Sequence, residues 1–525
     1  MKRIDRSDKV RNNFHQAKWD EPIIFELSQK GERGIQVPHA EEDIVAQVGD
    51  GFSTIPANMR RATAPLLPEI SQPRVLRHYM RLSQETLGAD VNIEIGQGTC
   101  TVKYSPKVND ALGRLPGMAA LHPLQAEETV QGILEIIYKT DCFMREISGL
   151  DRFTFQPGSG SHAILTMASV VTKYFEEKGE SEQRNEIITT IYSHPSDSAA
   201  PAVKGYKIIH IQPDENGYPD FEAFKEAVSE KTAAFFVANP EDTGVYNSRV
   251  VEFTELVHKH GGLCGYDQAN ANGLLGVTRA KDAGFDMCFF NLHKTFSTPH
   301  ACGGPACGAT GVTTELEKYL PGPLVDQAGE RFTLNHSNTF DPKSVGKVRS
   351  FLGVAPVILK AYSWIMSMGA EGLYEVAKVA VLNNNYLFKK LMEIECVDAP
   401  YTPGKQRVEQ VRYTLEKMTK DTGITTGDVQ RRMMDFGMHY WSSHHPYHIA
   451  EPMTLEPTET ASKEDLDEYI ATLTQVFKEA YENPAIIRSA PNNSVCHMVD
   501  GSGVDDPEQW CITWRSYLKK TNPDQ

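Results

Sequence analysis

The sequence predicts an α/β fold in which a large domain with a mostly parallel sheet is followed by a smaller α/β domain. The first observation is an alternation between residues 150 and 294, where short apolar runs such as AAFFVANP and DMCFF are separated by helical stretches such as DFEAFKEAVSEK. The second is that the chain from about residue 395 mixes short strands and helices. We therefore expect a large domain over residues 126–345 and a smaller one over 346–525.

The residues before these domains are predicted to form an extended N-terminal segment, 1–125, because proline and glycine recur in it. A short helix is expected over 74–88. The first helix of the large domain is expected over 127–149, since apolar residues recur there at helical spacing and the stretch ends on Gly149.

Five strands are predicted for the parallel sheet, in NEIITTIYS, KIIHI, AAFFVANP, LCGYDQAN and DMCFFNLHK. Helices are expected between them, and one long helix is expected from about residue 344 to 393. Polar side chains end four of these runs, at His194, Asn239, Asp267 and Lys294. Ligands of such sheets bind beyond the carboxyl ends of the strands, which makes these side chains candidates for a site.

Composition excludes several classes of partner. The chain has 525 residues and a net charge of −16, which argues against nucleic acid and against an anionic membrane surface as the main partner. It contains no apolar run of the roughly 18 residues that a membrane-spanning helix needs and no apolar core of a signal peptide. Its nine cysteines form no CxxC pair, so neither a disulfide framework nor a metal site is expected. We therefore expect a cytoplasmic protein.

Four candidate groups carry chemistry. Lys294 directly follows a buried strand, where a desolvated lysine is a Schiff-base nucleophile, although a surface lysine is the alternative. Asp267 could hold a pyridinium nitrogen protonated, or could cap a turn. His194 could stack on an aromatic cofactor, or form a turn. The loop Gly158–Ser161 offers backbone N–H groups and two hydroxyls at a helix start, which is an anion site.

The order of these groups is more specific than any one of them. A phosphate loop, a histidine, an aspartate and a lysine follow one another at strand ends of one sheet. This is the plan of the aspartate-aminotransferase-like fold type I enzymes, which use pyridoxal 5'-phosphate.

Longer sequence segments, spread over nearly the whole chain, identify one family within this class. The sequence resembles the glycine decarboxylase (P-protein) family of the glycine cleavage system, most closely the separate C-terminal-half subunit of its two-subunit form. The matching strings are LRHYMRLSQ, GTCTVKYSP, LHPLQ, FQPGSG, ANPEDTGVY, YDQANANGLLG, FNLHKTFSTPH, KSVGKVRSF, MGAEGLYEVAKVAVLNNNYL and LEPTETASKEDLD.

The resemblance implies a role for each matching position. It implies that Lys294 carries pyridoxal 5'-phosphate covalently, that Asp267 faces the ring nitrogen and that His194 lies against the ring. The further cofactor-binding residues that it implies are Gly158, Ser159, Gly160, Ser161, Asn239, Ala269 and His293. It also implies that Thr99, Cys100 and Lys103 line the substrate side.

The resemblance implies an activity as well. Glycine would be decarboxylated and its aminomethyl group passed to a lipoyl carrier protein. The chain would form a homodimer or a heterotetramer with an N-terminal-half subunit. The alternative is a paralogous decarboxylase, aldolase or aminotransferase that acts on a different amino acid without a carrier.

Departures from the family pattern keep that alternative open. The family's His-Glu pair in the small domain is replaced around RVEQVRY. The other replaced positions are Ile95 (tyrosine in the family), Ile164 (glutamate), Pro195 (glycine), Asp197 (asparagine), and Ala301 and Cys302 (glycines). The cofactor residues are thus kept while the substrate surroundings differ, and we expect the chain alone to exchange carbon dioxide with glycine poorly.

Overall fold

A computed structural model describes residues 10–522, except for 50, 89–90, 94, 96–102, 301–303, 402, 439–447, 496, 499–500, 502 and 504–505. Its centre is a seven-stranded sheet in the order β1-β7-β6-β5-β4-β2-β3. The strands are β1 (Arg152–Thr154), β2 (Glu186–Thr190), β3 (Lys207–Ile211), β4 (Thr232–Ala238), β5 (Leu263–Gln268), β6 (Met287–Asn291) and β7 (Gly308–Val312). β7 is antiparallel to both neighbours and the other pairs are parallel. The predicted α/β class is confirmed, and the five predicted strands are β2 to β6.

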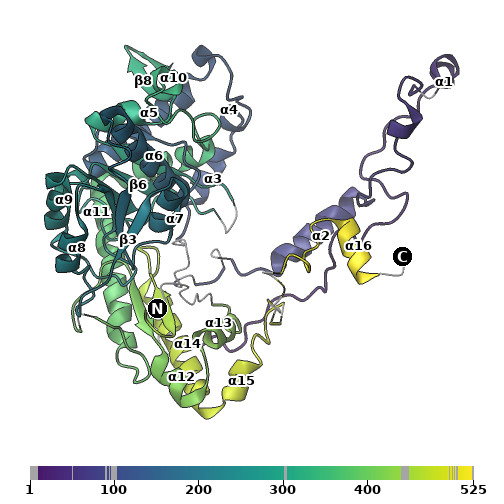
Figure 1. The fold of residues 1–525 in the computed structure, drawn as a ribbon. Helices are drawn as coiled ribbons and strands as arrows, with labels where there is room; N and C mark the ends of the chain where they lie inside the picture. Colours follow the sequence, from purple (N-terminus) through teal and green to yellow (C-terminus); the bar gives the residue numbers. More distant parts are fainter. Residues whose placement is uncertain are drawn as a thin grey trace.

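Both faces of the sheet are covered by helices (Figure 1). Helix α6 (Gly160–Lys178) packs on one face, where Phe236 lies in its core. Helices α5 (Gln131–Ser148), α8 (Phe221–Ala227), α9 (Val250–Lys259) and the first part of α11 cover the other, where Phe235 lies. Successive strand residues point to opposite faces, so a strand that is buried on both sides reads as a continuous apolar run.

Helix α11 (Ala355–Leu391) joins this core to a second one. Trp364 packs in the core of the large sheet, the helix is interrupted at Gly369 with φ 67°, and Leu387 packs in the C-terminal core. That core is formed with α12 (Glu416–Thr422), α13 (Thr426–Met434), α14 (Lys463–Glu482), α15 (Pro484–Arg488) and the antiparallel pair β10 (Val411–Thr414) and β11 (Pro452–Leu455). The expected boundary at residues 345/346 remains a prediction.

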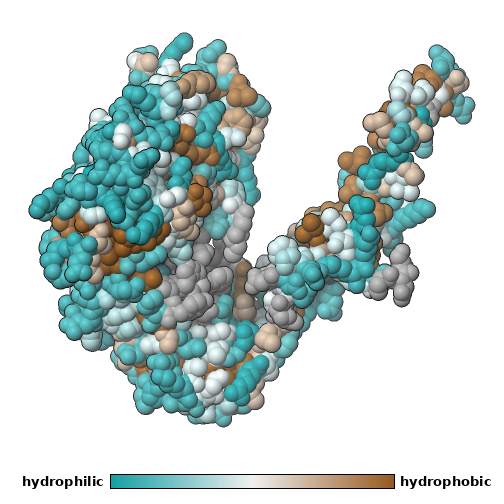
Figure 2. All heavy atoms as spheres, viewed as in Figure 1, coloured by the Kyte–Doolittle hydropathy of each residue, from teal (hydrophilic) through white to brown (hydrophobic). Residues whose placement is uncertain are grey.

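Part of the N-terminal segment and the C-terminal residues form a projecting arm, which we define as residues 18–88 together with 506–522 (Figure 1). It contains α1 (Glu42–Val48), α2 (Gln72–Gln84) and α16 (Trp514–Thr521) and projects away from both cores. Phe25 stacks on Trp514 with ring centroids 5.1 Å apart, which joins the two ends. Apolar side chains lie on the surface of the arm (Figure 2), among them Ile35, which is 77% exposed. No helix in the described part of the chain is long and apolar enough to cross a membrane.

The remaining helices and strands lie near the edge strand β1 or before α5. They are α3 (Lys107–Gly113), α4 (Pro116–Ala119), β8 (Leu324–Ala328), β9 (Arg331–Asn335) and α10 (Ser337–Phe340).

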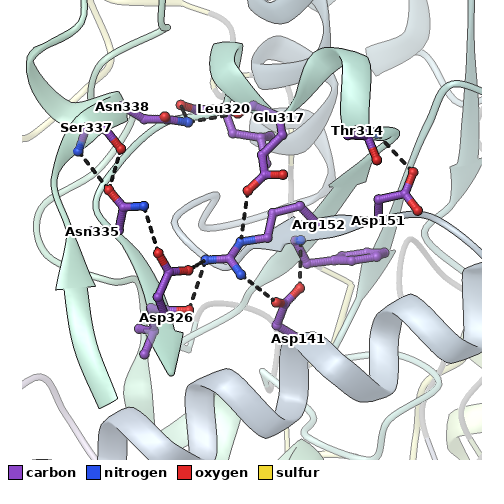
Figure 3. Close-up of polar contacts among 12 residues, drawn as sticks. Asp141, Asp151, Arg152, Thr314, Glu317, Leu320, Asp326, Asn335, Ser337 and Asn338 are labelled. Carbon is purple, nitrogen blue, oxygen red and sulfur yellow. Dashed lines mark hydrogen bonds and ion pairs between the residues drawn. The ribbon is translucent and has the colours of Figure 1, made fainter. Parts of the chain in front are cut away.

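A buried arginine connects the edge strand β1 to its neighbours (Figure 3). Arg152 of β1 donates to Asp326 of β8 at 2.5 Å and to Asp141 of α5 at 3.4 Å. Burial raises the pKa of Asp141 to about 6 although the charge of Arg152 opposes this shift. The cluster ties α5 and the β8–β9 hairpin to β1.

Candidate active site

The turn after β6 positions Lys294. The Lys294 backbone N–H donates to the Asn291 carbonyl at 3.0 Å, and the next side chain, Thr295, accepts from the Ala271 N–H at 2.9 Å. Further along, Ser297 has φ 59° and its hydroxyl donates to the Tyr104 carbonyl at 2.6 Å. Lys294 is 8% exposed, and within the described residues its ammonium has no hydrogen bond or ion pair. The turn therefore holds a buried lysine with its amine free to react.

Asp267 occupies the neighbouring strand β5 and lies close enough to Lys294 for the lysine's charge to act on it. It is buried, and one carboxylate oxygen accepts the Ala269 N–H at 2.8 Å. Burial raises the pKa of Asp267 to about 6, while the positive charge of Lys294 acts in the opposite direction. Two of the predicted site residues, which are 27 positions apart, thus meet at one edge of the sheet.

His194 and Asn239 follow β2 and β4 at the same edge, with different surroundings. The Nδ1 atom of His194 lies 2.7 Å from the Ser196 hydroxyl and accepts the Ser196 N–H at 3.1 Å, which fixes the ring at the start of α7 (Ser196–Val203). The side chain of Asn239 donates to the Asn247 carbonyl at 3.1 Å and accepts the Asn247 N–H at 2.8 Å. Asn239 therefore closes its own loop and has its side-chain amide in use.

The loop Gly158–Ser161 lies at the N-terminus of α6, where free N–H groups favour an anion. Ser159 caps the helix by accepting the His162 N–H at 3.2 Å. A side chain at Gly160 would lie 2.8 Å from the Asn291 amide nitrogen, and one at Gly158 would lie 2.5 Å from an Arg349 guanidinium nitrogen. Arg349 thus adds a cation to the anion loop, and the sequence analysis had not singled it out.

His293, next to the lysine, is neutral. Its Nδ1 accepts the Cys307 N–H at 3.3 Å, which assigns the ring proton to Nε2. Burial and the charge of Lys294 lower the pKa of His293 to about 3. This hydrogen bond ties the turn to the residue before β7, and the predicted contact of His293 with the cofactor stays a prediction.

The C-terminal domain brings carboxylates to this edge. Glu409 is 3% exposed, and burial together with Glu456 raises its pKa well above the usual range, while Lys294 lowers it. Glu456 accepts hydrogen bonds from the amides of Asn270 at 2.6 Å and Asn272 at 2.8 Å. The segment RVEQVRY, interpreted above as lacking the family's His-Glu pair, therefore still supplies one glutamate next to Lys294.

Lys103 is the one described residue of the predicted substrate group, since Thr99 and Cys100 lie outside the described residues. Its ammonium lies 2.8 Å from Glu459 and 4.5 Å from the centre of the Trp364 ring. Burial lowers the pKa of Lys103 and Glu459 opposes that shift. Trp364 in turn contacts Phe296, two residues after Lys294, with ring centroids 5.9 Å apart. Lys103 thus contacts the lysine turn through the rings of Trp364 and Phe296, and its ammonium is already paired with Glu459.

Two of the replaced family positions are packing residues here. Ile164 is completely buried against the sheet in α6, and Ile95 is 1% exposed in the C-terminal core. The described residues also contain one group of three possible metal ligands, His258, Cys264 and Asp286. This group lies at the amino ends of β5 and β6, whereas Lys294 follows the carboxyl end of β6. Asp286 accepts hydrogen bonds from the His258 ring and the Cys264 N–H.

The polar atoms at the Lys294 edge fit a phosphorylated, aromatic cofactor with a ring nitrogen. Among the described residues, both carboxylate oxygens of Asp197, the Gln268 amide oxygen and the Asn291 amide oxygen are buried without a hydrogen-bond partner. Buried polar atoms normally have partners, so unpaired ones at one edge indicate a polar ligand. A free lysine, a carboxylate beside it and an anion loop supply the three kinds of contact that pyridoxal 5'-phosphate needs.

Comparisons with known proteins agree with this arrangement. Residues 157–304 match the family model "Aminotransferase class-V", and residues 376–497 match "Glycine dehydrogenase, C-terminal domain". The chain is 42% identical over 506 residues to the probable glycine dehydrogenase (decarboxylating) subunit 2 of Pyrococcus abyssi, covering 96% of this chain and 98% of that protein. It is 43% identical over 507 residues to the protein of the same name from Thermococcus kodakarensis, again covering 96% and 98%.

Solved structures show the fold. A crystal structure of glycine decarboxylase (P-protein) of the glycine cleavage system, in inhibitor-bound form, superposes with a TM-score of 0.70 at 21% identity, covering 84% of this chain and 100% of that one. A NifS-like protein superposes with a TM-score of 0.56 at 16% identity, covering 72% and 97%. On the identity and coverage of its relatives, the chain belongs to the glycine dehydrogenase (decarboxylating) subunit 2 family of fold type I, pyridoxal-phosphate-dependent enzymes.

Proposed function

We propose that this chain is the cofactor-carrying subunit of a two-subunit glycine decarboxylase in the cytoplasm. It removes carbon dioxide from glycine and delivers the aminomethyl group to a lipoyl carrier protein. The observation that carries the proposal is the meeting of Lys294 and Asp267: both are buried, they lie close together at adjacent strand ends, and the lysine has no partner among the described residues. Bound pyridoxal 5'-phosphate supplies an electron sink for the negative charge that forms on the substrate carbon as carbon dioxide leaves.

Lys294 holds the cofactor covalently, because it is a buried primary amine that makes no hydrogen bond or ion pair among the described residues. Asp267 holds the proton of the ring nitrogen. A carboxylate in a dry site interacts more strongly with a cation than one in water does. His194, which is fixed by Ser196, lies against the ring face and restrains it.

The phosphate group is held by the first turn of α6. The Gly160 and Ser161 N–H groups and the helix dipole favour an anion there, and glycine at 158 and 160 lets Arg349 and Asn291 approach the loop closely. Arg349 beside Gly158 adds a guanidinium, which suits phosphate geometrically. Ala269 serves the site through its N–H group, which orients Asp267.

Glu409 gives the site a second proton-holding group. Burial and the neighbouring Glu456 keep its carboxyl protonated, and it lies beside Lys294. The domain that carries Glu409 also covers the lysine turn, so the same residues that hold a proton exclude water from the reacting carbon.

The activity requires a partner subunit. The names of the relatives describe a subunit 2, and this chain carries an arm whose apolar side chains are exposed. Exposed apolar groups gathered on a projecting segment are typical of an interaction surface. We propose that the arm docks on the N-terminal-half subunit in a heterotetramer, and that the described free cysteines, which form no disulfides, suit a reducing compartment.

An amino acid titration tests the proposed function. The purified chain with its partner subunit is loaded with pyridoxal 5'-phosphate, and its visible absorbance is followed while glycine, alanine, serine or glutamate is added. We expect glycine to change the spectrum at the lowest concentration, and Lys294→Ala to abolish the change. A response to a larger amino acid without a response to glycine would identify a paralogue with another substrate.

A further inference from the structure

Asp197 is one of the buried acids at the Lys294 edge of the sheet, and neither the proposed cofactor contacts nor the proposed chemistry assigns it a partner. It lies in the first turn of α7, three residues after His194, and none of its surface is exposed. Neither of its carboxylate oxygens makes a hydrogen bond of normal geometry among the described residues, and the nearby His194 N–H only partly offsets the cost of burying a charge there. Its neighbour is the carboxyl of Asp267, which is itself an acceptor, so the two can be joined only by a proton.

Two ionised carboxylates cannot remain side by side in this interior. Each isolated buried charge is costly, and like charges a few ångströms apart add repulsion. Of the other charged groups near the pair, Asp242 adds negative charge and is paired with Arg412 at 2.8 Å, while Lys294 favours the ionised form of Asp267 and not that of Asp197.

Burial and Asp267 raise the pKa of Asp197 well above its usual range, whereas the pKa of Asp267 is raised to about 6. The contacts of the two carboxyl groups assign the single proton to Asp197, because only Asp267 accepts a well-formed backbone hydrogen bond. The charge resides on Asp267, which lies close to the positive Lys294 and accepts the Ala269 N–H.

We propose that Asp197 is a positioning residue for the cofactor: it stays protonated, donates its proton to the Asp267 carboxylate and thereby aims that carboxylate at the ring nitrogen. The inference rests on the proposed function, because it takes the ring nitrogen to lie at Asp267. With the Ala269 N–H on one side and the Asp197 hydroxyl on the other, Asp267 is held in one orientation. A carboxylate that accepts two hydrogen bonds is also less basic, so Asp197 sets how firmly the ring nitrogen keeps its proton.

The test compares Asp197→Asn, which keeps a donor of the same shape, with Asp197→Ala, which removes the donor. Asp141→Asn is the control, because Asp141 is also buried but lies at the Arg152 cluster. Infrared spectra of the full chain without cofactor at pH 7.5 detect protonated carboxyl groups. We expect one such band to disappear in Asp197→Asn and none to disappear in Asp141→Asn.

The same variants are then loaded with cofactor labelled with ¹⁵N in the ring. We expect Asp197→Asn to bind it within about threefold of the unmodified chain, and Asp197→Ala to bind it about tenfold more weakly with a shifted ¹⁵N resonance, because a hydrogen bond to a charged group is lost. If Asp197→Ala does not fold, the infrared and binding results of Asp197→Asn remain decisive.

Two results would overturn the proposal: an unchanged infrared band in Asp197→Asn, or unchanged affinity and ¹⁵N shift in Asp197→Ala. If the band disappears as expected but the unmodified chain binds no cofactor, the shared proton stands. The positioning role then falls together with the proposed function.

Discussion

At the scale of single residues, desolvation outweighs charge pairing around Lys294. The pKa of Asp267 is raised rather than lowered although Lys294 lies nearby, and the pKa values of Glu409 and Asp197 are raised further. The carboxyl groups of Glu409 and Asp197 therefore keep their protons at neutral pH. Such perturbed groups, gathered at one edge of a sheet, are the usual mark of a catalytic site.

Asp267→Asn should keep the cofactor and lose most of the turnover. A neutral amide cannot hold a proton on the ring nitrogen, so the electron sink weakens by several kcal/mol, on the order of a 10³-fold rate loss. The comparison is with Asp141→Asn, which makes the same chemical change at the Arg152 cluster and should leave turnover within about threefold. Full activity in Asp267→Asn would make Asp267 a structural residue.

Glu241 should make the stability of the chain depend on pH. It is 3% exposed, accepts a hydrogen bond from Thr190, and burial raises its pKa to about 8. Because the folded pKa exceeds the unfolded one, its contribution is complete below about pH 4.5 and is lost as pH rises through 8. Glu241→Gln, which does not titrate, should gain stability relative to the unmodified chain between pH 5 and 8.

Urea unfolding midpoints at pH 5, 7 and 9 measure this. The exposed Glu252, paired with Arg249 at 2.8 Å, provides the control Glu252→Gln, whose difference from the unmodified chain should stay small. Parallel pH curves for Glu241→Gln and the unmodified chain would show that Glu241 does not carry the effect.

At the scale of elements, the site is assembled from strand ends, one helix start and segments distant in sequence. The turn after β6 is held by Ala271 from the loop after β5 and by Tyr104 from the N-terminal segment. Lys103, one residue before Tyr104, is paired with Glu459 shortly before α14. The cofactor turn and the C-terminal domain are therefore fastened to the same short stretch of chain.

Lys103→Met should destabilise this junction by about 3 kcal/mol, because removing one partner of a buried ion pair leaves the other uncompensated. Glu459→Gln in the same chain should restore most of the loss. Urea unfolding of the two single variants and the double variant gives the coupling between them. Additive losses would show that the pair contributes no energy of its own.

The sequence predicted the elements better than the contacts between them. Strand ends were predictable from the apolar runs, and because parallel strands end at one edge of the sheet, Lys294 and Asp267 were expected there together; their roles were assigned from the resemblance. The prediction that Asn239 binds cofactor stays a prediction; its side chain closes the loop after β4, which depends on the path of the chain there. Arg349 and Glu409 reach the site from beyond the sheet, and only tertiary packing decides that approach.

At the scale of the whole molecule, the chain combines two packed cores with an arm that packs on neither (Figure 1). Glu21 binds His78 at 2.9 Å and Arg81 at 3.0 Å, so the arm has an internal structure of its own. An ordered projection with apolar side chains on its surface (Figure 2) suits an assembly in which a partner covers it.

Substitutions on the arm should weaken assembly and leave cofactor binding intact. Ile35 and Val37 are 77% and 75% exposed, so replacing both with serine costs the folded chain little. We expect the double variant to bind the N-terminal-half subunit at least tenfold more weakly in light-scattering titrations. The control is a double variant in which Val203 and Val277, two exposed residues outside the arm, are replaced with serine. Equal binding by both variants would place the interface elsewhere.

Exchange of labelled bicarbonate into the carboxyl group of glycine measures the proposed decarboxylation itself. The chain is assayed alone, with the N-terminal-half subunit, and with that subunit and a lipoyl carrier protein. We predict poor exchange by the chain alone, rapid exchange in the complete mixture, and none when Lys294→Ala replaces the chain. Failure of the complete mixture to label glycine, while another amino acid is decarboxylated, would contradict the account.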